Sequence, residues 1–311
     1  MKDNNKNNEG LVSIITLTYN KLEFITKLID SVLMQDYPFL ELIVSDDGSD
    51  NFDIDSLYRY IDKANNKNID IYIFHHKYNI GLVKNMNSAI RNSRGEYICV
   101  LSGDDQFCNS HVVTDIVNEM RKKQCSLLMT GGFLCDSDLN VLCEYPKKKY
   151  RKYIYSMDTP HKQLMKHIVG MNFEMVTGSL MSYTRKLYDD MGGFDEAYDL
   201  YEDGPFVAKI TSMGYKVDTN YEIPTRFIRT GGISANPTNP RMKKDLDLYH
   251  SRWLTNYDIC KNSYEIRRLK YWKRVLSTDN SVSKALVCIF HPIFTFEYIK
   301  YFYIINIKRN C

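Results

Sequence analysis

Short apolar runs alternate with amphipathic segments of helix length over the first hundred residues, and this order constrains the fold more than any other feature. Strands are expected at residues 11–19, 40–50, 69–76 and 96–103, and helices at 22–35, 54–64 and 81–93. The strand segments are apolar on both faces, as in a parallel sheet that helices cover on each side. The sequence therefore predicts an α/β fold with a mostly parallel central sheet flanked by helices.

Polar residues follow three of these strands, namely Tyr19-Asn20, Asp46-Asp47-Gly48-Ser49 and Gly103-Asp104-Asp105. Ligands bind beyond the carboxyl ends of strands in open α/β sheets, because loops and helix N-termini converge there. A buried carboxylate needs a cation or hydrogen-bond donors, and oxygen ligands alone suit Mg²⁺ or Mn²⁺. A polar turn with a helix cap is the structural alternative.

The composition is that of a globular protein, with 44% hydrophobic and 25% charged residues in a chain of 311. The eight cysteines show no CxxC spacing, and we expect free thiols in a reducing compartment. The start MKDNNKNNEG lacks the apolar run of a signal peptide, so a cytoplasmic location is expected. Residues 236–311 hold 14 Lys and Arg against 6 Asp and Glu, which would attract an anionic partner.

The ordered motifs resemble the inverting family-2 glycosyltransferases with the GT-A fold, of the bacterial surface-polysaccharide type. The resemblance covers residues 11–235 and rests on VSIITLTYNK, FLELIVSDDGSD, YNIGLVKNMNSAI, GEYICVLSGDD, GGFDE and YEDGPF. It implies a Rossmann-like domain with a nucleotide-sugar-binding half at 1–110 and an acceptor-binding, catalytic half at 111–235. A basic, aromatic-rich helical tail would follow at 236–311.

The resemblance places the nucleotide-sugar against the first strand ends, where Thr18, Tyr19, Asn20 and Asp47 lie. Tyr19 would pack on the base, and Asp47 would accept a hydrogen bond from the ring N3–H of uracil or thymine. An Asx-turn is the structural alternative for Asp47, and Asp46 would either fix that turn or touch ligand. Lys84, near the start of a helix, would contact phosphate or remain an exposed lysine.

The segment LSGDDQF resembles the DXD-type motif of the family, with Ser102 where an acid is usual. The resemblance implies that Asp105 binds Mn²⁺ or Mg²⁺ and that Asp104 contacts ribose or a metal-bound water. The missing acid predicts a low metal affinity. RFIRTGGISAN at 226–236 has the form of a flexible segment in which Arg229, Thr230 and Ser234 reach phosphate oxygens on closure.

In YEDGPF the resemblance assigns Asp203 as the general base and Glu202 as the alternative, which would otherwise anchor the loop or the acceptor. Inversion needs one base on the acceptor side, which takes the hydroxyl proton as the oxygen attacks. Acids are also ordinary in a first helical turn, where they offset the helix dipole.

The tail contains a basic helix at 264–276 and an apolar segment at 285–309 that His291, Pro292, Glu297 and Lys300 interrupt. These interruptions disfavour a membrane span and favour an amphipathic segment that meets anionic lipid through residues 264–309. A helix packed on the catalytic domain or a dimer contact is the alternative. Nucleic acid is not expected, because no recognition module accompanies the charge.

We therefore expect a metal-dependent, inverting hexosyltransferase that moves one sugar from a UDP- or dTDP-sugar to a saccharide acceptor. By resemblance the acceptor is lipid-linked and belongs to O-antigen, capsule or exopolysaccharide assembly at the inner face of the cell membrane, with a homo-oligomer possible. One alternative is a nucleotidyltransferase, which would want a glycine-rich loop where this chain has LTYNKLEF. The other is an inactive nucleotide-binding scaffold of the same fold.

Overall fold

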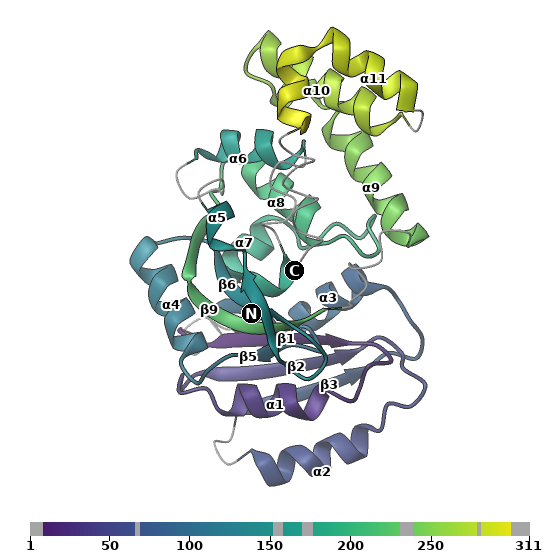
Figure 1. Ribbon diagram of the computed structural model, residues 1–311. Coiled ribbons are helices and arrows are strands. Elements are labelled where there is room, and N and C mark those ends of the chain that lie inside the picture. Colours follow the sequence, from purple (N-terminus) through teal and green to yellow (C-terminus); the bar gives the residue numbers. More distant parts are fainter. Residues whose placement is uncertain are drawn as a thin grey trace.

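A mixed sheet forms the centre of the protein, described by a computed structural model for residues 9–65, 69–151, 158–169, 177–230, 239–278 and 281–299. Its strand order is β3-β2-β1-β4-β8-β6-β9-β5, with β7 paired to β6 (Figure 1). The strands are β1 Val12–Thr18, β2 Leu40–Asp46, β3 Asp70–His75, β4 Tyr97–Val100, β5 Gln106–Phe107, β6 Leu127–Cys135, β7 Val141–Tyr145, β8 Met181–Thr184 and β9 Asp218–Arg229.

The described helices alternate with these strands in the first half and gather in the second. They are α1 Ile25–Leu33, α2 Ile54–Ala64, α3 Leu82–Arg91, α4 Val112–Lys123, α5 Lys148–Arg151, α6 Pro160–His167, α7 Arg185–Asp190, α8 Asp203–Ser212, α9 Pro240–Trp253, α10 Ser263–Leu276 and α11 Ser281–Phe290. Figure 1 shows α1 and α2 at one end of the molecule and α10 and α11 at the other.

The α/β prediction is confirmed, and the four strands expected from the sequence pair in parallel as β3-β2-β1-β4. Strands of the second half add antiparallel pairs, among them β4 with β8 and β6 with β8. The last expected strand, 96–103, ends earlier at Val100. Backbone bonds from Leu101 and Gly103 still follow β1, but the chain already turns there toward the paired acids.

Two apolar layers cover the sheet, and neighbouring residues of β1 point into different ones because side chains alternate along a strand. Ile14 belongs to the layer beneath α1, α2 and α4. Ile15 belongs to the layer that α3, α6 and α8 share with Tyr249 of α9 and Trp272 of α10. The tail helices therefore pack into the same core as the helix that follows β3.

The cysteines differ in one respect from the sequence-based expectation. Cys99, Cys108, Cys125, Cys135, Cys260 and Cys288 are free thiols, as expected. Cys143 of β7 is disulfide-bonded, so the expectation is wrong at that position.

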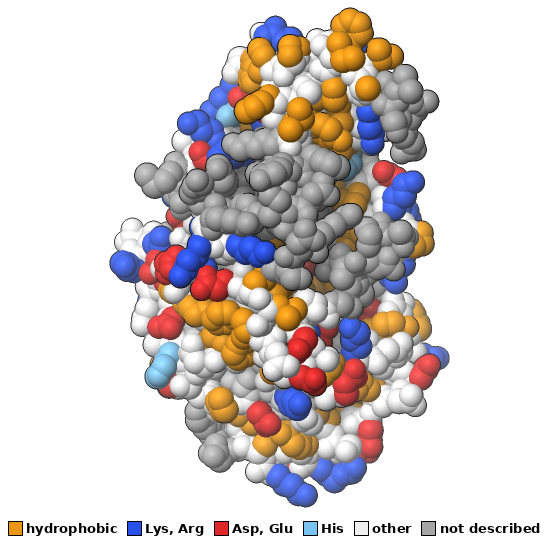
Figure 2. Space-filling model, in the orientation of Figure 1, with side chains coloured by type: hydrophobic (Ala, Val, Ile, Leu, Met, Phe, Trp, Pro, Cys, Tyr) orange, Lys and Arg blue, Asp and Glu red, His pale blue; other side chains and the backbone are white. Residues whose placement is uncertain are grey.

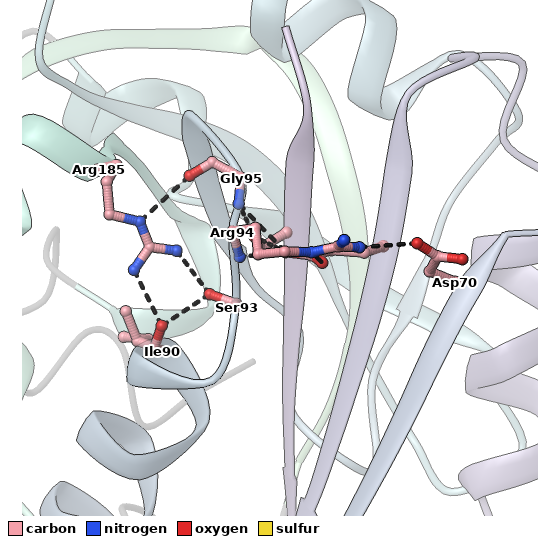
Figure 3. Close-up of polar contacts among 8 residues, drawn as sticks. Asp70, Ile90, Ser93, Arg94, Gly95 and Arg185 are labelled. Carbon is pink, nitrogen blue, oxygen red and sulfur yellow. Dashed lines mark hydrogen bonds and ion pairs between the residues drawn. The ribbon is translucent and has the colours of Figure 1, made fainter. Parts of the chain in front are cut away.

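A buried polar network closes the end of the sheet where β1, β2 and β4 begin. The Glu41 carboxylate is fully buried and accepts hydrogen bonds from Ser13 Oγ (2.7 Å) and from the backbone N–H groups of Arg94 (2.5 Å) and Gly95 (3.1 Å). The Arg94 side chain continues to Asp70 at 2.7 Å (Figure 3). Glu41 thus joins three strands through groups that have little access to water.

Arg185 of α7 extends this network to the neighbouring helix. Its guanidinium donates to the carbonyl oxygens of Ile90 (2.9 Å) and Gly95 (3.2 Å) and to Ser93 Oγ (2.6 Å), as Figure 3 shows. These contacts fix the end of α3 against the start of β4. The opposite, carboxyl ends of the strands are left for the candidate site.

We expect Glu41→Ala to lower the free energy of unfolding by roughly 2–4 kcal/mol, because Ser13 Oγ and the Arg94 amide lose their acceptor. Urea unfolding measures this change. Glu23→Ala is the control, since Glu23 is an exposed glutamate. Equal unfolding midpoints for the two variants would contradict the role given to Glu41.

Candidate active site

Hydrogen bonds tie the carboxyl ends of β1, β2 and β4 together. The Asp47 amide donates to the Thr18 carbonyl (2.9 Å) and the Asn20 amide to Ser49 Oγ (2.7 Å). The Gly103 amide donates to the carbonyl of Leu17, near the end of β1 (3.0 Å). Gly103 approaches β1 so closely that an added Cβ would lie 2.7 Å from a carbonyl oxygen. The three polar segments predicted to meet at one rim do so.

Asp46 holds the turn after β2, which was one of its two predicted roles. Its buried carboxylate accepts from the amides of Gly48 (3.1 Å) and Ser49 (2.8 Å) and from Ser49 Oγ (2.6 Å), and it lies 2.8 Å from His75 Nδ1. Gly48 has a φ of +82°, and a Cβ there would lie 2.5 Å from the backbone of Tyr78. The sequence SDDGS therefore forms a rigid turn that presents the next residue, Asp47.

Asp47 is 5% exposed and faces the segment that precedes α3. Its carboxylate accepts from the amides of Ile80 (2.8 Å) and Gly81 (3.2 Å), and burial raises its pKa above the ordinary value. A carboxylate oxygen has two lone pairs, so these bonds leave acceptor capacity for a further N–H donor. Tyr19 directly follows Thr18, whose carbonyl accepts from the Asp47 amide, and 44% of its surface is exposed, as a stacking platform requires.

The two acids of LSGDDQF differ in exposure. Asp105 is 2% exposed and accepts from the Arg229 amide at 3.1 Å, whereas the Asp104 side chain is 19% exposed and lies 3.6 Å from Lys21 Nζ. Burial, and secondly the charge of Asp104, raise the pKa of Asp105 to about 7. The Arg229 amide and the Ser179 hydroxyl act in the opposite direction and lower it. A divalent cation would offset this burial, and the oxygen-only donor set fits Mg²⁺ or Mn²⁺.

Two carboxylate side chains are too few to complete the coordination of a divalent cation by protein ligands alone. In the part of the chain that the structure describes, no group of three His, Cys, Asp or Glu side chains is placed to hold a metal ion. Ser102, at the position where an acid was expected, instead bonds Ser179 Oγ at 2.7 Å. A metal here would depend on other oxygen donors, such as those of a diphosphate.

Arg229 is buried behind the paired acids and is already engaged. Its guanidinium donates to the carbonyl oxygens of Ser137 (3.0 Å) and Asp104 and lies 4.1 Å from the ring centre of Phe24. Arg229 therefore supports the Asp104 turn, and its contact with phosphate stays a prediction. Thr230 is exposed. Ser234 lies outside the described residues.

Glu202 and Asp203 stand at the start of α8. The Asp203 carboxylate accepts from the amides of Gly178 (3.1 Å) and Gly204 (2.6 Å), and burial raises its pKa to about 6. Burial and then the charge of Asp203 raise the pKa of Glu202 well above its ordinary value. The two carboxyl groups interact, so they titrate as a pair whose pKa values are raised.

A short 3₁₀ turn, Gly178–Leu180, joins the two groups of acids. Its Gly178 amide bonds Asp203, while the hydroxyl of the next residue, Ser179, bonds Ser102 and contributes to the pKa of Asp105. A Cβ at position 178 would lie 2.5 Å from Glu202 Oε1, so glycine allows this approach. Asp203 thus bonds this turn directly, and Asp105 is linked to it through Ser102, whose carbonyl accepts from the Asp105 amide at 2.9 Å.

Asp245 of α9 was missed by the sequence analysis. It is 1% exposed, and its Oδ2 accepts from the amides of Asp199 (2.9 Å), Leu200 (2.7 Å) and Tyr201 (3.1 Å). Arg241, one turn earlier on α9, pairs with the Asp199 carboxylate at 2.7 Å. These contacts fix the segment that leads into Glu202 and Asp203, and no motif around Asp245 signals them.

Asn87 of α3 fixes the Gly-Phe-Asp-Glu turn. Its side chain accepts from Tyr188 Oη (2.8 Å) and the Phe194 amide (3.0 Å) and donates to Glu196 (2.9 Å). Lys84, at the start of the same helix, is exposed. Both predicted alternatives for Lys84, a phosphate contact and a solvated lysine, remain open.

The mixed sheet with its flanking helices and acid-lined rim is the GT-A fold of glycosyltransferases. Solved structures of this fold superpose on it. Staphylococcus aureus TarS superposes with a TM-score of 0.60 at 18% identity over 84% of this chain and 42% of its own. The mannosyltransferase PcManGT of Pyrobaculum calidifontis, in complex with GDP-Man and Mn²⁺, gives 0.60 at 17% identity over 89% and 73%. TarS 1–349 in complex with UDP-GlcNAc gives 0.57 at 20% identity over 89% and 69%.

A sequence profile of glycosyl transferase family 2 matches residues 13–192, more than half of the chain, and the chain belongs to this family. Escherichia coli WcaA, named for colanic acid biosynthesis, is 29% identical over 48% of this chain and 53% of its own length. An uncharacterized glycosyltransferase of Rickettsia prowazekii is 24% identical over 78% and 70%. The chain thus spans about half the length of WcaA.

Proposed function

We propose that this chain is an inverting glycosyltransferase that moves one sugar from a UDP- or dTDP-sugar to a saccharide acceptor. The observation that carries the proposal is the Gly178–Leu180 turn. Its Gly178 amide bonds the candidate base Asp203, and its Ser179 hydroxyl bonds Ser102, whose carbonyl accepts from the amide of the candidate metal ligand Asp105. An in-line displacement needs the leaving group and the base close together, with the anomeric carbon between them.

The donor would lie along the rim from Asp47 to Asp105. Asp47 would accept the ring N3–H of uracil or thymine, and Tyr19 would pack on the base. Asp105 and the more exposed Asp104 would hold Mn²⁺ or Mg²⁺, which when bound neutralises the charge that grows on the leaving diphosphate. The TarS structure with UDP-GlcNAc supports this class of donor. PcManGT, which contains GDP-Man and Mn²⁺, supports the metal but not the choice of nucleotide base.

Asp203 would act as the general base. The amides of Gly178 and Gly204 orient its carboxylate, and both bonds favour the ionised form that a base needs. It would take the proton of the acceptor hydroxyl while that oxygen attacks the anomeric carbon from the face opposite the diphosphate, which inverts the configuration. Glu202 would anchor the acceptor or the loop.

The acceptor is proposed to be a growing, lipid-linked saccharide of a bacterial surface polysaccharide, at the inner face of the cell membrane. Relatives named for colanic acid and teichuronic acid biosynthesis support this class of product. The acceptor side would be built by α8 and the Gly-Phe-Asp-Glu turn, whose position Asn87 fixes.

Nucleotide binding tests this proposal directly. In the presence of Mn²⁺, UDP or dTDP should raise the melting temperature, while ADP and GDP should not. Asp47→Ala should weaken UDP binding by roughly tenfold or more, because a hydrogen bond to a charged group is lost. Asp50→Ala, an exposed acid of the same turn, is the control. Equal affinity for all four nucleotides would contradict the donor assignment, and binding without turnover of any such donor would support the scaffold alternative.

A further inference from the structure

Large apolar side chains lie exposed along α11 and the helical residues 292–299 that follow it. Six of them are between 50% and 74% exposed: Leu286, Ile289, Phe290, Ile293, Phe296 and Ile299. We call these six residues the apolar face. Three lie on α11 and three on residues 292–299, and within each helix they are spaced three or four residues apart along one face. Isolated exposed apolar residues are ordinary, but a continuous row marks an interaction site.

The apolar face is the outer side of a packed unit. Phe294, from the opposite side of the same helical segment, is 6% exposed and lies 5.5 Å from the ring of Tyr271. Tyr298 lies 5.8 Å from the ring of the fully buried Trp272. These contacts hold residues 292–299 against α10. The apolar face takes no part in this packing and stays exposed.

The charge around this face is positive. Four exposed basic residues lie on α10: Arg267, Lys270, Lys273 and Arg274. Of the two described acids of α10 and residues 292–299, Glu297 forms an ion pair with Arg268 at 2.7 Å, and Glu265 lies 3.0 Å from His161 Nε2. Figure 2 shows hydrophobic side chains gathered at the end formed by α10 and α11, with Lys and Arg side chains beside them.

An apolar helical row with uncompensated basic charge beside it is suited to the boundary between lipid headgroups and acyl chains. In the described part of the chain, no helix has the length and apolarity needed to cross a bilayer, so the contact would be with its surface. A second copy of the chain fits less well, because it would bring the same positive charge to the interface.

We propose that the apolar face docks on an anionic lipid surface, with the basic residues of α10 meeting the headgroups. Docking would hold the candidate active site beside a membrane, and only the link to a lipid-linked acceptor rests on the proposed function. The interaction itself needs neither donor nor metal.

Vesicle sedimentation of the full chain tests the docking. We expect binding to phosphatidylcholine vesicles that contain phosphatidylglycerol, weaker binding to phosphatidylcholine alone, and a decrease with added salt. The double variant Ile289→Asp/Phe290→Asp should bind at least about tenfold more weakly, because it places negative charges in the apolar face that would enter the lipid. Met34→Asp/Phe39→Asp is the matched control, since Met34 and Phe39 are 59% and 58% exposed on another part of the surface.

Circular dichroism and the melting temperature establish that the double variant is folded. Equal vesicle binding by this variant and the control would overturn the proposal. So would a wild-type chain that ignores vesicles but forms dimers that the double variant abolishes. Transfer to a water-soluble saccharide acceptor should be the same in the wild type and the variant, so failure of docking is distinguishable from failure of the glycosyltransferase assignment.

Discussion

Asp203→Asn should lower the turnover number by at least about a hundredfold, because an amide cannot take the proton of the attacking hydroxyl. Donor binding should stay near the wild-type value, since the role proposed for Asp203 is to take a proton from the acceptor and not to hold the donor. Steady-state transfer assays measure the first quantity and titration with a UDP-sugar the second. Asn keeps the size of the side chain and one acceptor oxygen for the Gly178 amide.

A matched control for this variant is Asp55→Asn. Asp55 is an exposed acid in the first turn of α2, as Asp203 is an acid in the first turn of α8, so both changes remove a charge near a helix N-terminus. The control should retain wild-type turnover. Glu202→Gln should have the smaller effect of the two acid-pair variants, and a larger loss than for Asp203→Asn would reverse their roles.

The pH profile gives the same assignment a second readout. Because the pKa of Asp203 is raised to about 6, its base form is present above that pH and is lost as the pH falls through it. The wild-type kcat/KM should therefore decline below about pH 6 and reach a plateau at neutral pH. A plateau that extends unchanged to pH 5 would exclude Asp203 as the base.

The residues at the strand ends could be predicted because they depend on short-range rules. Asp46, Asp47 and Asp105 follow buried strands, and parallel strands bring such ends to one edge of the sheet. The turn SDDGS and its glycine are also local features. The expected meeting of Asp47, Asp105 and Asp203 at one site required the family resemblance, because nearly a hundred residues separate the last two.

Asp245 and Ser179 could not be predicted, because their partners are distant in sequence. Asp245 accepts amides from residues 199–201, more than forty positions away, and it sits in a basic segment without a motif. Ser179 takes part in the site through Ser102, which is 77 residues away. The division of the chain into 1–110, 111–235 and 236–311 stays a prediction, although α9 contributes directly to the segment before Asp203.

In the tail, the sequence predicted the helix of residues 264–276, and the structure confirms it as α10. The sequence could not show which aromatic residues of the following segment are buried. Phe290 and Phe294 are four positions apart, yet the first is 74% exposed and the second 6%. Pro292 separates them, so they do not share one uninterrupted helix, and the break turns Phe294 toward Tyr271.

Asp105→Asn is the second variant with a large expected effect. It should weaken Mn²⁺-dependent binding of UDP by about ten- to a hundredfold, since charge-assisted contacts are roughly twice as strong as neutral ones and Asp105 is the buried acid of the pair. Titration of UDP with Mn²⁺ and with excess chelator measures the loss. Chelator should weaken binding to the wild type and leave the variant nearly unchanged.

The melting temperature without metal separates a lost ligand from a lost fold. Burial disfavours the ionised form of the Asp105 carboxylate. Replacing it by a neutral amide should therefore leave the metal-free protein at least as stable as the wild type. Asp138→Asn, an exposed acid in a nearby turn, is the control for both measurements. Full Mn²⁺-dependent binding by the Asp105 variant would show that the metal does not bind at the paired acids. The position proposed for the diphosphate would then be wrong as well.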